Sequence, residues 1–319
     1  MPLIRALEDL NKQFPRPVLT IGNFDGVHLG HQALFNLVKN RAAEIQGTSM
    51  VMTFEPHPLR VLTKQQGPPL ITLYDQKIEL IQQCGIDVVI CLDFTPELAA
   101  LEPEDFIRKV LVDHIGLAEI VIGYDYTFGR KARGNREMLM EMGNQYGFKV
   151  HTVGAQPGPD GAVTSSTRIR DLVQQGEVDK VPPLLGRYYR IAGRVVRGRD
   201  RGGKLLGFPT ANLRLVDELI PKTGVYAVRV THAGQTYHGV ANIGYNPTFG
   251  DVGLSVEVHC FDFSQSIYDE DIRVEFIARV RDEKKFSGPE DLASQIQKDC
   301  QLARHVLSDS RLGDEKAAG

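Results

Sequence analysis

Two histidines and three glycines lie close together near the start of this chain of 319 residues. The glycines are Gly22, Gly26 and Gly30, and the histidines are His28 and His31. Residues three apart at the start of a helix project on one face, so both imidazoles can face one ligand. Glycine allows positive φ and close approach of the backbone to that ligand. Because imidazoles can donate hydrogen bonds to phosphate oxygens, the stretch predicts a nucleotide-phosphate site.

A strand must precede this loop and a helix must follow it. Residues 18–21 are a short β-prone run, and residues 32–45 repeat apolar side chains at helical spacing. The helix N-terminus then points N–H groups at the loop, where an anion is held. The His-Leu-Gly-His spacing resembles the HxGH motif of nucleotidyltransferases. Two other interpretations stay open, namely solvated histidines or half of a zinc site, although zinc needs about four ligands.

Hydroxyl and guanidinium groups precede a predicted helix near residue 166. Ser166, Thr167 and Arg168 are followed by Arg170. With a helix N-terminus these groups suit a departing pyrophosphate. Taken alone, Ser166 equally suits an N-cap and the arginines equally suit a solvated surface.

Two loops that follow strand-like runs supply candidates for a substrate pocket. Asp125 and Phe128 follow residues 119–123, and His57 follows residues 49–54. Ligands of open α/β sheets gather where strands end. The aromatic, acidic and basic residues after residue 123 suit a flat heteroaromatic substrate that carries a phosphate. Both segments equally suit ordinary connections.

A second candidate nucleotide site lies beyond residue 197. Residues 198–205 match the GxxxxGK part of a P-loop, but Leu205 has no hydroxyl for magnesium and no helix follows. We therefore reject a P-loop. Thr210 and Asn212 offer a hydroxyl and a carbonyl on one side of an extended segment. Magnesium accepts such oxygens together with nucleotide phosphates, which predicts a Mg-ATP site.

A base for this second site is sought on the predicted strand at residues 255–261. Glu257 lies on the face opposite Val256 and Val258. Its carboxylate can accept a proton from a substrate hydroxyl, if that face meets Thr210 across a cleft. The other interpretation is a solvated carboxylate on an ordinary strand.

Composition limits the classes of partner. The net charge of −3 implies no general attraction to nucleic acid or to a membrane. The arginines between residues 187 and 204 leave open an RNA-binding alternative, which predicts salt-sensitive binding. No stretch approaches the ~20 apolar residues of a membrane span. The four cysteines have neither disulfide nor metal-site spacing, which predicts a cytoplasmic location.

The chain divides into two predicted domains and a tail. Alternating strands and helices in residues 1–182 predict a parallel sheet covered on both faces. Strands dominate residues 183–308 and predict a small closed β-structure that ends in a helix at residues 290–307. Residues 309–319 read as a disordered tail, and Pro182-Pro183 marks the boundary. The predicted strands are 18–21, 49–54, 88–94 and 119–123 in the first domain and 190–196, 224–230, 236–243, 255–261 and 271–277 in the second.

Taken together, the motifs resemble those of the bacterial bifunctional riboflavin kinase/FMN adenylyltransferases, also called FAD synthetases. The resemblance covers nearly the whole chain. Departures from the family pattern are Tyr188, where proline is expected, and Asp269, where glycine is usual. The matching segments, in the family's order, are residues 20–31, 123–129, 165–170, 206–212, 246–250 and 256–257.

This resemblance implies a Rossmann-like nucleotidyltransferase domain followed by a six-stranded riboflavin-kinase barrel with a terminal helix. It also implies two ATP-dependent reactions, from riboflavin to FMN and from FMN to FAD plus pyrophosphate, with Mg²⁺ as metal. An alternative is a single-activity FMN adenylyltransferase whose barrel binds flavin without catalysis. No nucleic-acid or membrane partner is implied, and no particular oligomeric state.

The resemblance also assigns roles by position. His28 and His31 contact the ATP α-phosphate, and Glu257 is the kinase base. The remaining implied contacts with ATP or phosphate are Gly22, Phe24, Asp25, Gly30, Ser166, Thr167 and Arg168 in the adenylyltransferase and Gly198, Lys204, Gly207, Thr210 and Asn212 in the kinase, with Thr210 and Asn212 also holding the metal. The flavin or nucleotide pocket is assigned to His57, Asp125 and Phe128.

Overall fold

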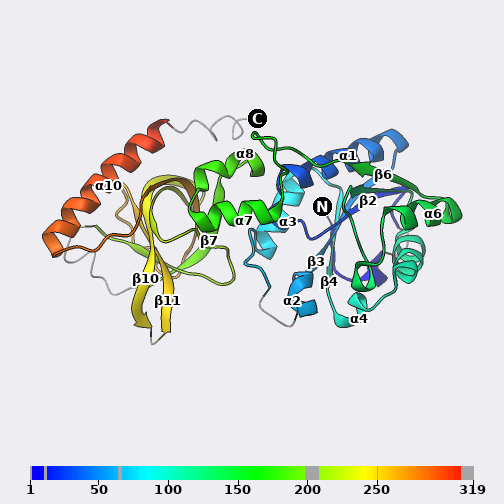
Figure 1. Ribbon diagram of the computed structural model, residues 1–319, viewed down its shortest axis with the longest axis horizontal. Coiled ribbons are helices and arrows are strands. Elements are labelled where there is room, and N and C mark those ends of the chain that lie inside the picture. The colour runs from blue at the N-terminus through cyan, green and yellow to red at the C-terminus, as the bar shows by residue number, and fades with distance from the viewer. Residues whose placement is uncertain (1, 11–12, 64–66, 198–207, 250, 310–319) are drawn as a thin grey trace. The chain divides into compact units, whose positions relative to one another are not determined.

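The computed structural model describes residues 2–10, 13–63, 67–197, 208–249 and 251–309 (Figure 1). Its contacts divide the chain into two compact units, Met1–Ser166 and Thr167–Gly319. The domain boundary predicted at residues 182/183 lies later in the chain than this division, and it stays a prediction.

The first unit is built on a parallel sheet of six strands in the order β1-β4-β3-β2-β5-β6. The prediction of a parallel sheet is therefore confirmed. The four predicted strands correspond to β2–β5, which are almost wholly buried because their residues are apolar on both faces. The strands are β1 (Leu3–Ile4), β2 (Pro17–Ile21), β3 (Thr48–Glu55), β4 (Val88–Asp93), β5 (Glu119–Gly123) and β6 (Lys149–Val153).

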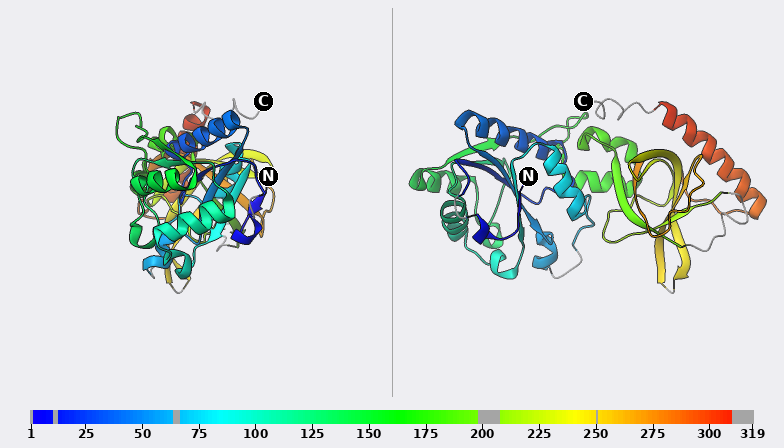
Figure 2. Two further views of the ribbon diagram at one scale, coloured as in Figure 1. Left: turned by 90° about the vertical axis from the view of Figure 1, so that its right-hand side faces the viewer. Right: turned by 180° about the vertical axis from the view of Figure 1, so that it is seen from behind.

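Helices cover both faces of this sheet (Figures 1 and 2). One apolar layer joins the sheet to α1 and α3 through Phe35, Val38 and Ile81. A second apolar layer, on the opposite face, joins the sheet to η2 and α6 through Ile107 and Leu139. Of these two helices, η2 is a π-helix. The helices are η1 (Leu7–Asp9), α1 (Leu29–Ile45), α2 (Pro58–Thr63), α3 (Tyr74–Gln83), α4 (Pro96–Ala99), α5 (Pro103–Asp105), η2 (Phe106–Ile115), η3 (Arg130–Ala132) and α6 (Arg136–Tyr146).

The second unit is a closed antiparallel barrel of six strands in the order β10-β11-β8-β7-β12-β9. Five of these correspond to predicted strands, and β8 is the sixth strand that the family resemblance implied. The strands are β7 (Tyr189–Val196), β8 (Ala211–Arg214), β9 (Gly224–His232), β10 (Gln235–Phe249), β11 (Asp251–Cys260) and β12 (Asp271–Arg281).

The barrel is filled by aromatic rings and capped outside by a helix. Tyr189, Tyr226 and Phe276 are at most 1% exposed, and their rings contact one another at centroid distances of 5.4 and 6.1 Å. The predicted C-terminal helix is confirmed as α10 (Pro289–Asp309), which packs apolar side chains on the outer face. Arg281 of β12 donates to the buried carboxylate of Asp299 at 2.8 and 3.0 Å. The predicted tail beyond Asp309 lies outside the described residues.

The segment before the barrel packs against it, which explains why the second unit begins before residue 183. It contains α7 (Ser166–Gln175), η4 (Val178–Lys180) and α8 (Pro182–Leu185). The carbonyl of Val173 accepts a hydrogen bond from the backbone of Lys222 at 3.3 Å, and a Cβ at Gly176 would lie 3.0 Å from Tyr226. In the described ranges, no helix is both long and apolar enough to cross a bilayer.

Candidate active sites

The loop between β2 and α1 places the two histidine rings side by side. Helix α1 begins at Leu29, earlier than the predicted residue 32, because His28 acts as its N-cap. The Nδ1 atom of His28 accepts a hydrogen bond from the backbone of His31 at 3.3 Å. The two imidazoles stack with centroids 3.5 Å apart. Both rings therefore stand together at a helix N-terminus, where an anion is stabilised.

The backbone of this loop is tightly constrained. Gly26 has φ +89°, whereas a Cβ at Gly30 would lie 3.0 Å from the ring of His28. Phe24 and Val27 also have positive φ, of 50° and 41°. Side chains rarely allow this conformation, least of all a β-branched one. Such backbone strain persists only where the surroundings determine the conformation, and it gathers at functional sites.

The buried ring of Phe24 packs against the ring of His31. Its side chain is 2% exposed, and its ring meets the rings of His31 and Phe35 edge-on at 5.2 and 4.9 Å. A Cβ at Gly22 would lie 2.9 Å from the Phe24 ring, so glycine is needed at this position for packing. The structure thus gives Phe24 a packing role under the site, while a direct contact with ATP stays a prediction.

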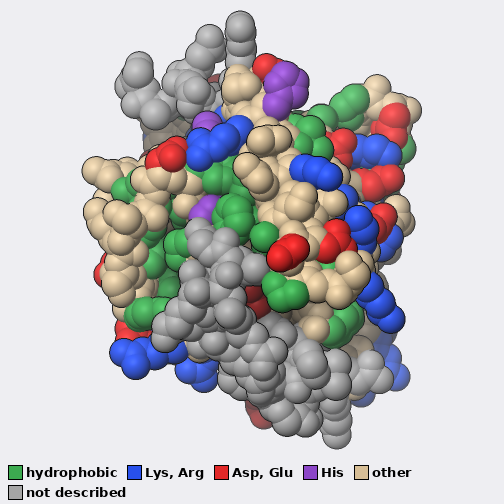
Figure 3. All heavy atoms as spheres, turned by 90° about the vertical axis from the view of Figure 1, so that its left-hand side faces the viewer, with side chains coloured by type: hydrophobic (Ala, Val, Ile, Leu, Met, Phe, Trp, Pro, Cys, Tyr) green, Lys and Arg blue, Asp and Glu red, His purple; other side chains and the backbone are tan. Residues whose placement is uncertain are grey.

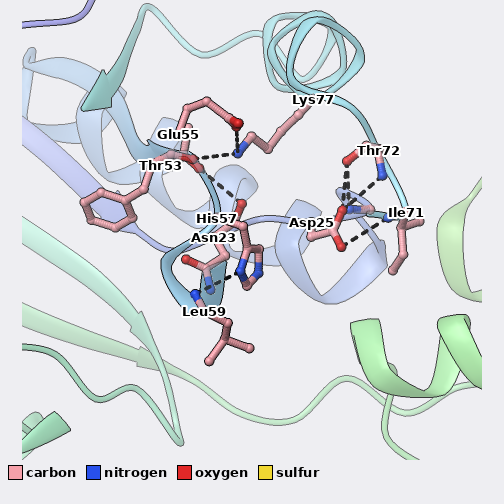
Figure 4. Close-up of polar contacts among 11 residues, drawn as sticks. Asn23, Asp25, Thr53, Glu55, His57, Leu59, Ile71, Thr72 and Lys77 are labelled. Carbon is pink, nitrogen blue, oxygen red and sulfur yellow. Dashed lines mark hydrogen bonds and ion pairs between the residues drawn. The ribbon is translucent and has the colours of Figure 1, made fainter. Parts of the chain in front are cut away.

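Asp25 connects the loop to two other segments. It is 4% exposed, and its carboxylate accepts hydrogen bonds from the backbones of Ile71 and Thr72 at 3.2 and 3.0 Å (Figure 4). The hydroxyl of Thr72 donates to the same carboxylate at 3.2 Å and accepts from the backbone of Gly26 at 3.0 Å. The Asp25 carbonyl accepts from the Ser166 hydroxyl at 2.9 Å. This arrangement suits a positioning group, because a carboxylate repels phosphate.

Residues 164–166, at the start of the second predicted phosphate element, lie beside the histidine loop. The Thr164 carbonyl would be 3.7 Å from a Cβ at Gly30, and Ser166 bonds to the loop as described above. Thr167 and Arg168 follow in the first turn of α7. The structure therefore brings residues 164–166 to the loop, although 130 or more residues of chain separate them.

The carboxyl end of β3 lies at the same edge. The hydroxyl of Thr53 donates to the carbonyl of Asn23 in the loop at 3.1 Å. His57 follows and is 7% exposed, and its Nδ1 accepts a hydrogen bond from the backbone of Leu59 at 3.2 Å. Because Nδ1 is the acceptor, a neutral His57 carries its proton on Nε2.

The two other pocket candidates differ in surroundings. Asp125 follows β5 and is exposed. Phe128 is 9% exposed and belongs to the apolar core, where its ring stacks on Tyr126 at 5.6 Å and meets Phe106 at 5.9 Å. Of the two, Asp125 is the one whose side chain reaches solvent.

In the barrel, strand register brings Glu257 and Asn212 together. The two residues are direct partners between β11 and β8, and Asn242 of β10 is the partner of Glu257 on its other side. Val256 and Val258 are buried and face inward, so this row lies on the outer face. Direct partners on neighbouring strands have Cβ atoms about 5 Å apart. Asn242 is a candidate that sequence reasoning missed, because only the register places it here.

His259 holds the segment that leads to Thr210. It shares the outer face with Glu257, and its Nδ1 lies 2.8 Å from the carbonyl of Pro209. A carbonyl only accepts, so Nδ1 carries the proton. The Phe208 ring meets the imidazole edge-on at 5.5 Å. The sequence alternation places His259 on the face of Glu257, but it does not predict the contact with Pro209. The predicted contacts Gly198, Lys204 and Gly207 lie outside the described residues.

Two arginines in the described part of the basic stretch contact side chains near the start of β12. Arg194 pairs with Asp271 at 3.2 Å, and the guanidinium of Arg197 lies 5.6 Å from the ring centre of Tyr268. On the face shown in Figure 3, Lys and Arg side chains alternate with Asp and Glu. Nucleic-acid sites instead favour basic side chains gathered on one face.

Comparison with known proteins assigns both halves of the chain. The FAD synthetase family model matches residues 10–168, and the riboflavin kinase model matches residues 185–307. A relative from Haemophilus influenzae named bifunctional riboflavin kinase/FMN adenylyltransferase is 38% identical over 95% of this chain and 98% of its own. A relative of the same name from Pseudomonas fluorescens is 38% identical over 97% of this chain and 99% of its own.

The fold also matches a solved structure over nearly its whole length. A crystal structure described as a macrolide-efflux protein from Streptococcus pneumoniae superposes with a TM-score of 0.84 at 31% identity. The match covers 95% of this chain and 98% of the other. The order of sheet unit and barrel unit is therefore shared with that protein.

Proposed function

Because this chain belongs to the bifunctional riboflavin kinase/FMN adenylyltransferase family, we propose that its two units catalyse successive steps of flavin cofactor synthesis. The barrel phosphorylates riboflavin with ATP and gives FMN and ADP. The first unit transfers AMP from a second ATP to FMN and gives FAD and pyrophosphate. The observation that carries the proposal is that both family models match in one chain, each on a unit of the corresponding fold.

In the kinase step, Glu257 accepts the proton of the terminal ribityl hydroxyl. That oxygen attacks the γ-phosphorus of ATP, the bond to the β-phosphate oxygen breaks, and ADP leaves. Asn212 is the direct strand partner of Glu257, and Thr210 immediately precedes β8. The Asn212 amide carbonyl and the Thr210 hydroxyl are hard oxygen donors that suit Mg²⁺ shared with the nucleotide phosphates. When bound, Mg²⁺ neutralises charge on those phosphates. Asn242 orients the Glu257 carboxylate, and His259 fixes the approach to Thr210.

In the adenylyltransferase step, a phosphate oxygen of FMN attacks the α-phosphorus of ATP and pyrophosphate leaves. His28 and His31 donate hydrogen bonds to the α-phosphate oxygens, on which negative charge grows. Ser166, Thr167 and Arg168 hold the departing pyrophosphate. Asp25 keeps the loop and Ser166 in register, as its hydrogen bonds indicate.

The flavin of this step lies at the carboxyl edge of the sheet. His57 and Asp125 follow β3 and β5, which flank β2 in the sheet, so both side chains belong to the edge where the loop begins. Phe128 supports that edge from the core. We place the enzyme in the cytoplasm, where ATP is available and where a reducing environment suits four cysteines whose spacing matches no disulfide framework.

The decisive experiment incubates the full chain with riboflavin and Mg-ATP and follows FMN and FAD separately by chromatography. Both products are expected, and FMN supplied with Mg-ATP should give FAD directly. An enzyme that makes FAD from FMN but no FMN from riboflavin would establish the single-activity alternative. Salt-sensitive binding of RNA without flavin turnover would establish the nucleic-acid alternative.

A further inference from the structure

Lys77 is a lysine in a place where lysines are rarely found. It lies on the buried face of α3 with Ile78 and Ile81 and is 6% exposed. Lysine is almost never so buried unless its ammonium has partners. Burial lowers the pKa of Lys77 from its usual value, and the charges of Glu55 and Asp25 act in the opposite direction. Removing the Lys77 ammonium from water therefore costs free energy, which a contact inside the protein must offset.

That contact is the end of strand β3 (Figure 4). The ammonium donates to the carbonyl of Phe54 at 3.0 Å and lies 3.9 Å from a carboxylate oxygen of Glu55. The carbonyl of Met52 accepts from the backbone of Gly22 on the β2 side. Carbonyls alternate in direction along a strand, so the Phe54 carbonyl points to the same side, where β2 has already turned into the histidine loop. Lys77 supplies the donor that the sheet no longer supplies.

The same short segment also holds the histidine loop. Ile71 and Thr72 bind the carboxylate of Asp25, and Thr72 accepts from Gly26. Residues 71–77 thus fix the loop at one point and the end of β3 at another. His57 stands three residues after Phe54, so its position opposite the loop depends on where β3 ends.

We propose that Lys77 is a positioning residue of the adenylyltransferase site: its ammonium, bonded to the Phe54 carbonyl, fixes the end of β3 and hence His57 relative to the histidine loop. This inference rests on the proposed function of that site. It concerns no atom of ATP or FMN, since the lysine is covered. Its consequence is that loss of the ammonium misplaces groups that act on substrate.

The first test replaces Lys77 by methionine, which keeps the apolar stem and removes the donor and the charge. Misplacement by about 1 Å can cost up to ~10²-fold in rate, so kcat for FAD formation from supplied FMN should fall at least ~10-fold. FMN formation from riboflavin should stay within about 2-fold, because the kinase belongs to the other unit. Lys109→Met is the matched control, since that lysine is half exposed on η2, and both its activities should stay normal.

Two further variants separate positioning from simple stability. Glu55→Gln removes the longer and weaker contact and should change FAD formation less than about 3-fold, because Glu55 is 36% exposed. Lys77→Ala leaves a cavity that a small alkylammonium ion can enter. Ethylammonium chloride should restore FAD formation by this variant, whereas tetramethylammonium chloride at equal concentration should not.

Retention of the wild-type kcat for FAD formation by folded Lys77→Met would overturn the proposal. So would equal losses of both activities, or a Lys77→Ala variant that no alkylammonium ion restores. If wild-type protein itself makes no FAD from FMN, the proposed function fails instead. The comparison of variants with wild type keeps these two failures distinct.

Discussion

The two units position their chemistry in different ways. In the first unit, the candidate site residues come from the loops after β2, β3 and β5 and from Ser166, the first residue of α7. Buried polar contacts hold these loops together, above all those of Asp25 and Lys77. In the barrel, Asn212, Glu257 and Asn242 lie in one row because the strand register places them there. A site built on loops needs additional side-chain hydrogen bonds to hold the loops in place. A site built on strands is positioned by the backbone hydrogen bonds that already form the sheet.

The difference extends to backbone strain. Phe24 and Val27 of the loop have positive φ, whereas Asn212, Glu257 and Asn242 are regular strand residues. Strained positions persist only when neighbours determine them. Loss of a supporting residue should therefore disturb the first site more than the second.

The largest effect is expected for Glu257→Gln, which keeps the side-chain size and removes the base. FMN formation should fall ~10²–10⁴-fold, while riboflavin binding changes little. FAD formation from supplied FMN should remain normal. The assay follows FMN and FAD separately. Glu275→Gln is the matched control, because Glu275 lies on β12, outside the row; wild-type FMN output from Glu257→Gln would refute its role as base.

The next largest effect is expected for His28→Ala or His31→Ala. Each removes a donor to the α-phosphate and should slow FAD formation by on the order of 10²-fold, with FMN formation near normal. Because the rings stack on each other, the double variant should lose less than the product of the two single losses. His114→Ala on η2 serves as control. Unaltered FAD synthesis in both single variants would make the loop merely structural.

Sequence patterns were sufficient to predict the central strands of the sheet and the position of the histidine loop. Continuous apolar runs mark β2–β5, whereas β1 and β8 have two and four residues and carry little periodic signal. Asp269, which replaces a usual glycine, has φ 63°, a conformation that aspartate tolerates better than most residues. The structure thus accounts for one departure from the family pattern.

The contacts of the site that the sequence did not predict join residues far apart in the chain. Phe24 and Asp25 belong to the motif, but adjacency in sequence does not show that both are buried. His259 contacts a carbonyl that is 50 residues away in the chain, and the alternation of β10 alone does not pair Asn242 with Glu257. Lys77 reads as an ordinary polar position of an amphipathic helix until the end of β3 is placed beside it.

A smaller effect is expected when the chain is divided. The fragments 167–319 and 183–319 should both fold and phosphorylate riboflavin, because the barrel has its own core. The longer fragment should melt several degrees higher, since it keeps the contacts of Val173 and Gly176 with the barrel unit. Thermal unfolding and kinase assays check this. An insoluble 183–319 together with an active 167–319 would move the domain boundary to the start of α7.

The smallest effect on either activity is expected at Glu119, a buried carboxylate at the start of β5. It is 3% exposed and accepts two hydrogen bonds from Arg41, at 2.8 and 2.9 Å. The Nε2 atom of His151, on β6, lies 2.8 Å from the carboxylate oxygen that also accepts from the Nε of Arg41. Bonding to Arg41, which outweighs burial, lowers the pKa of Glu119 below its usual value. These contacts lie at the amino ends of the strands, opposite the edge that carries the site, so Glu119→Gln should leave both activities within about 2-fold.

Glu119→Gln should instead lower the stability of the first unit. The pH dependence of that loss tests whether the ion pair with Arg41 causes it. A carboxyl group whose folded pKa is lowered stabilises the fold above its unfolded pKa of about 4.3, and this contribution is lost as pH falls through the folded pKa. Glu119→Gln should therefore destabilise the first unit by about 3 kcal/mol at pH 7, and the difference from wild type should shrink below about pH 4. Glu44→Gln, which alters the exposed partner of Arg41, should cost under about 0.5 kcal/mol. Hydrogen exchange at the β5 and β6 amides measures the local free energy of opening. A difference that stays constant down to pH 3 would show that packing, and not the ion pair with Arg41, makes Glu119 stabilising.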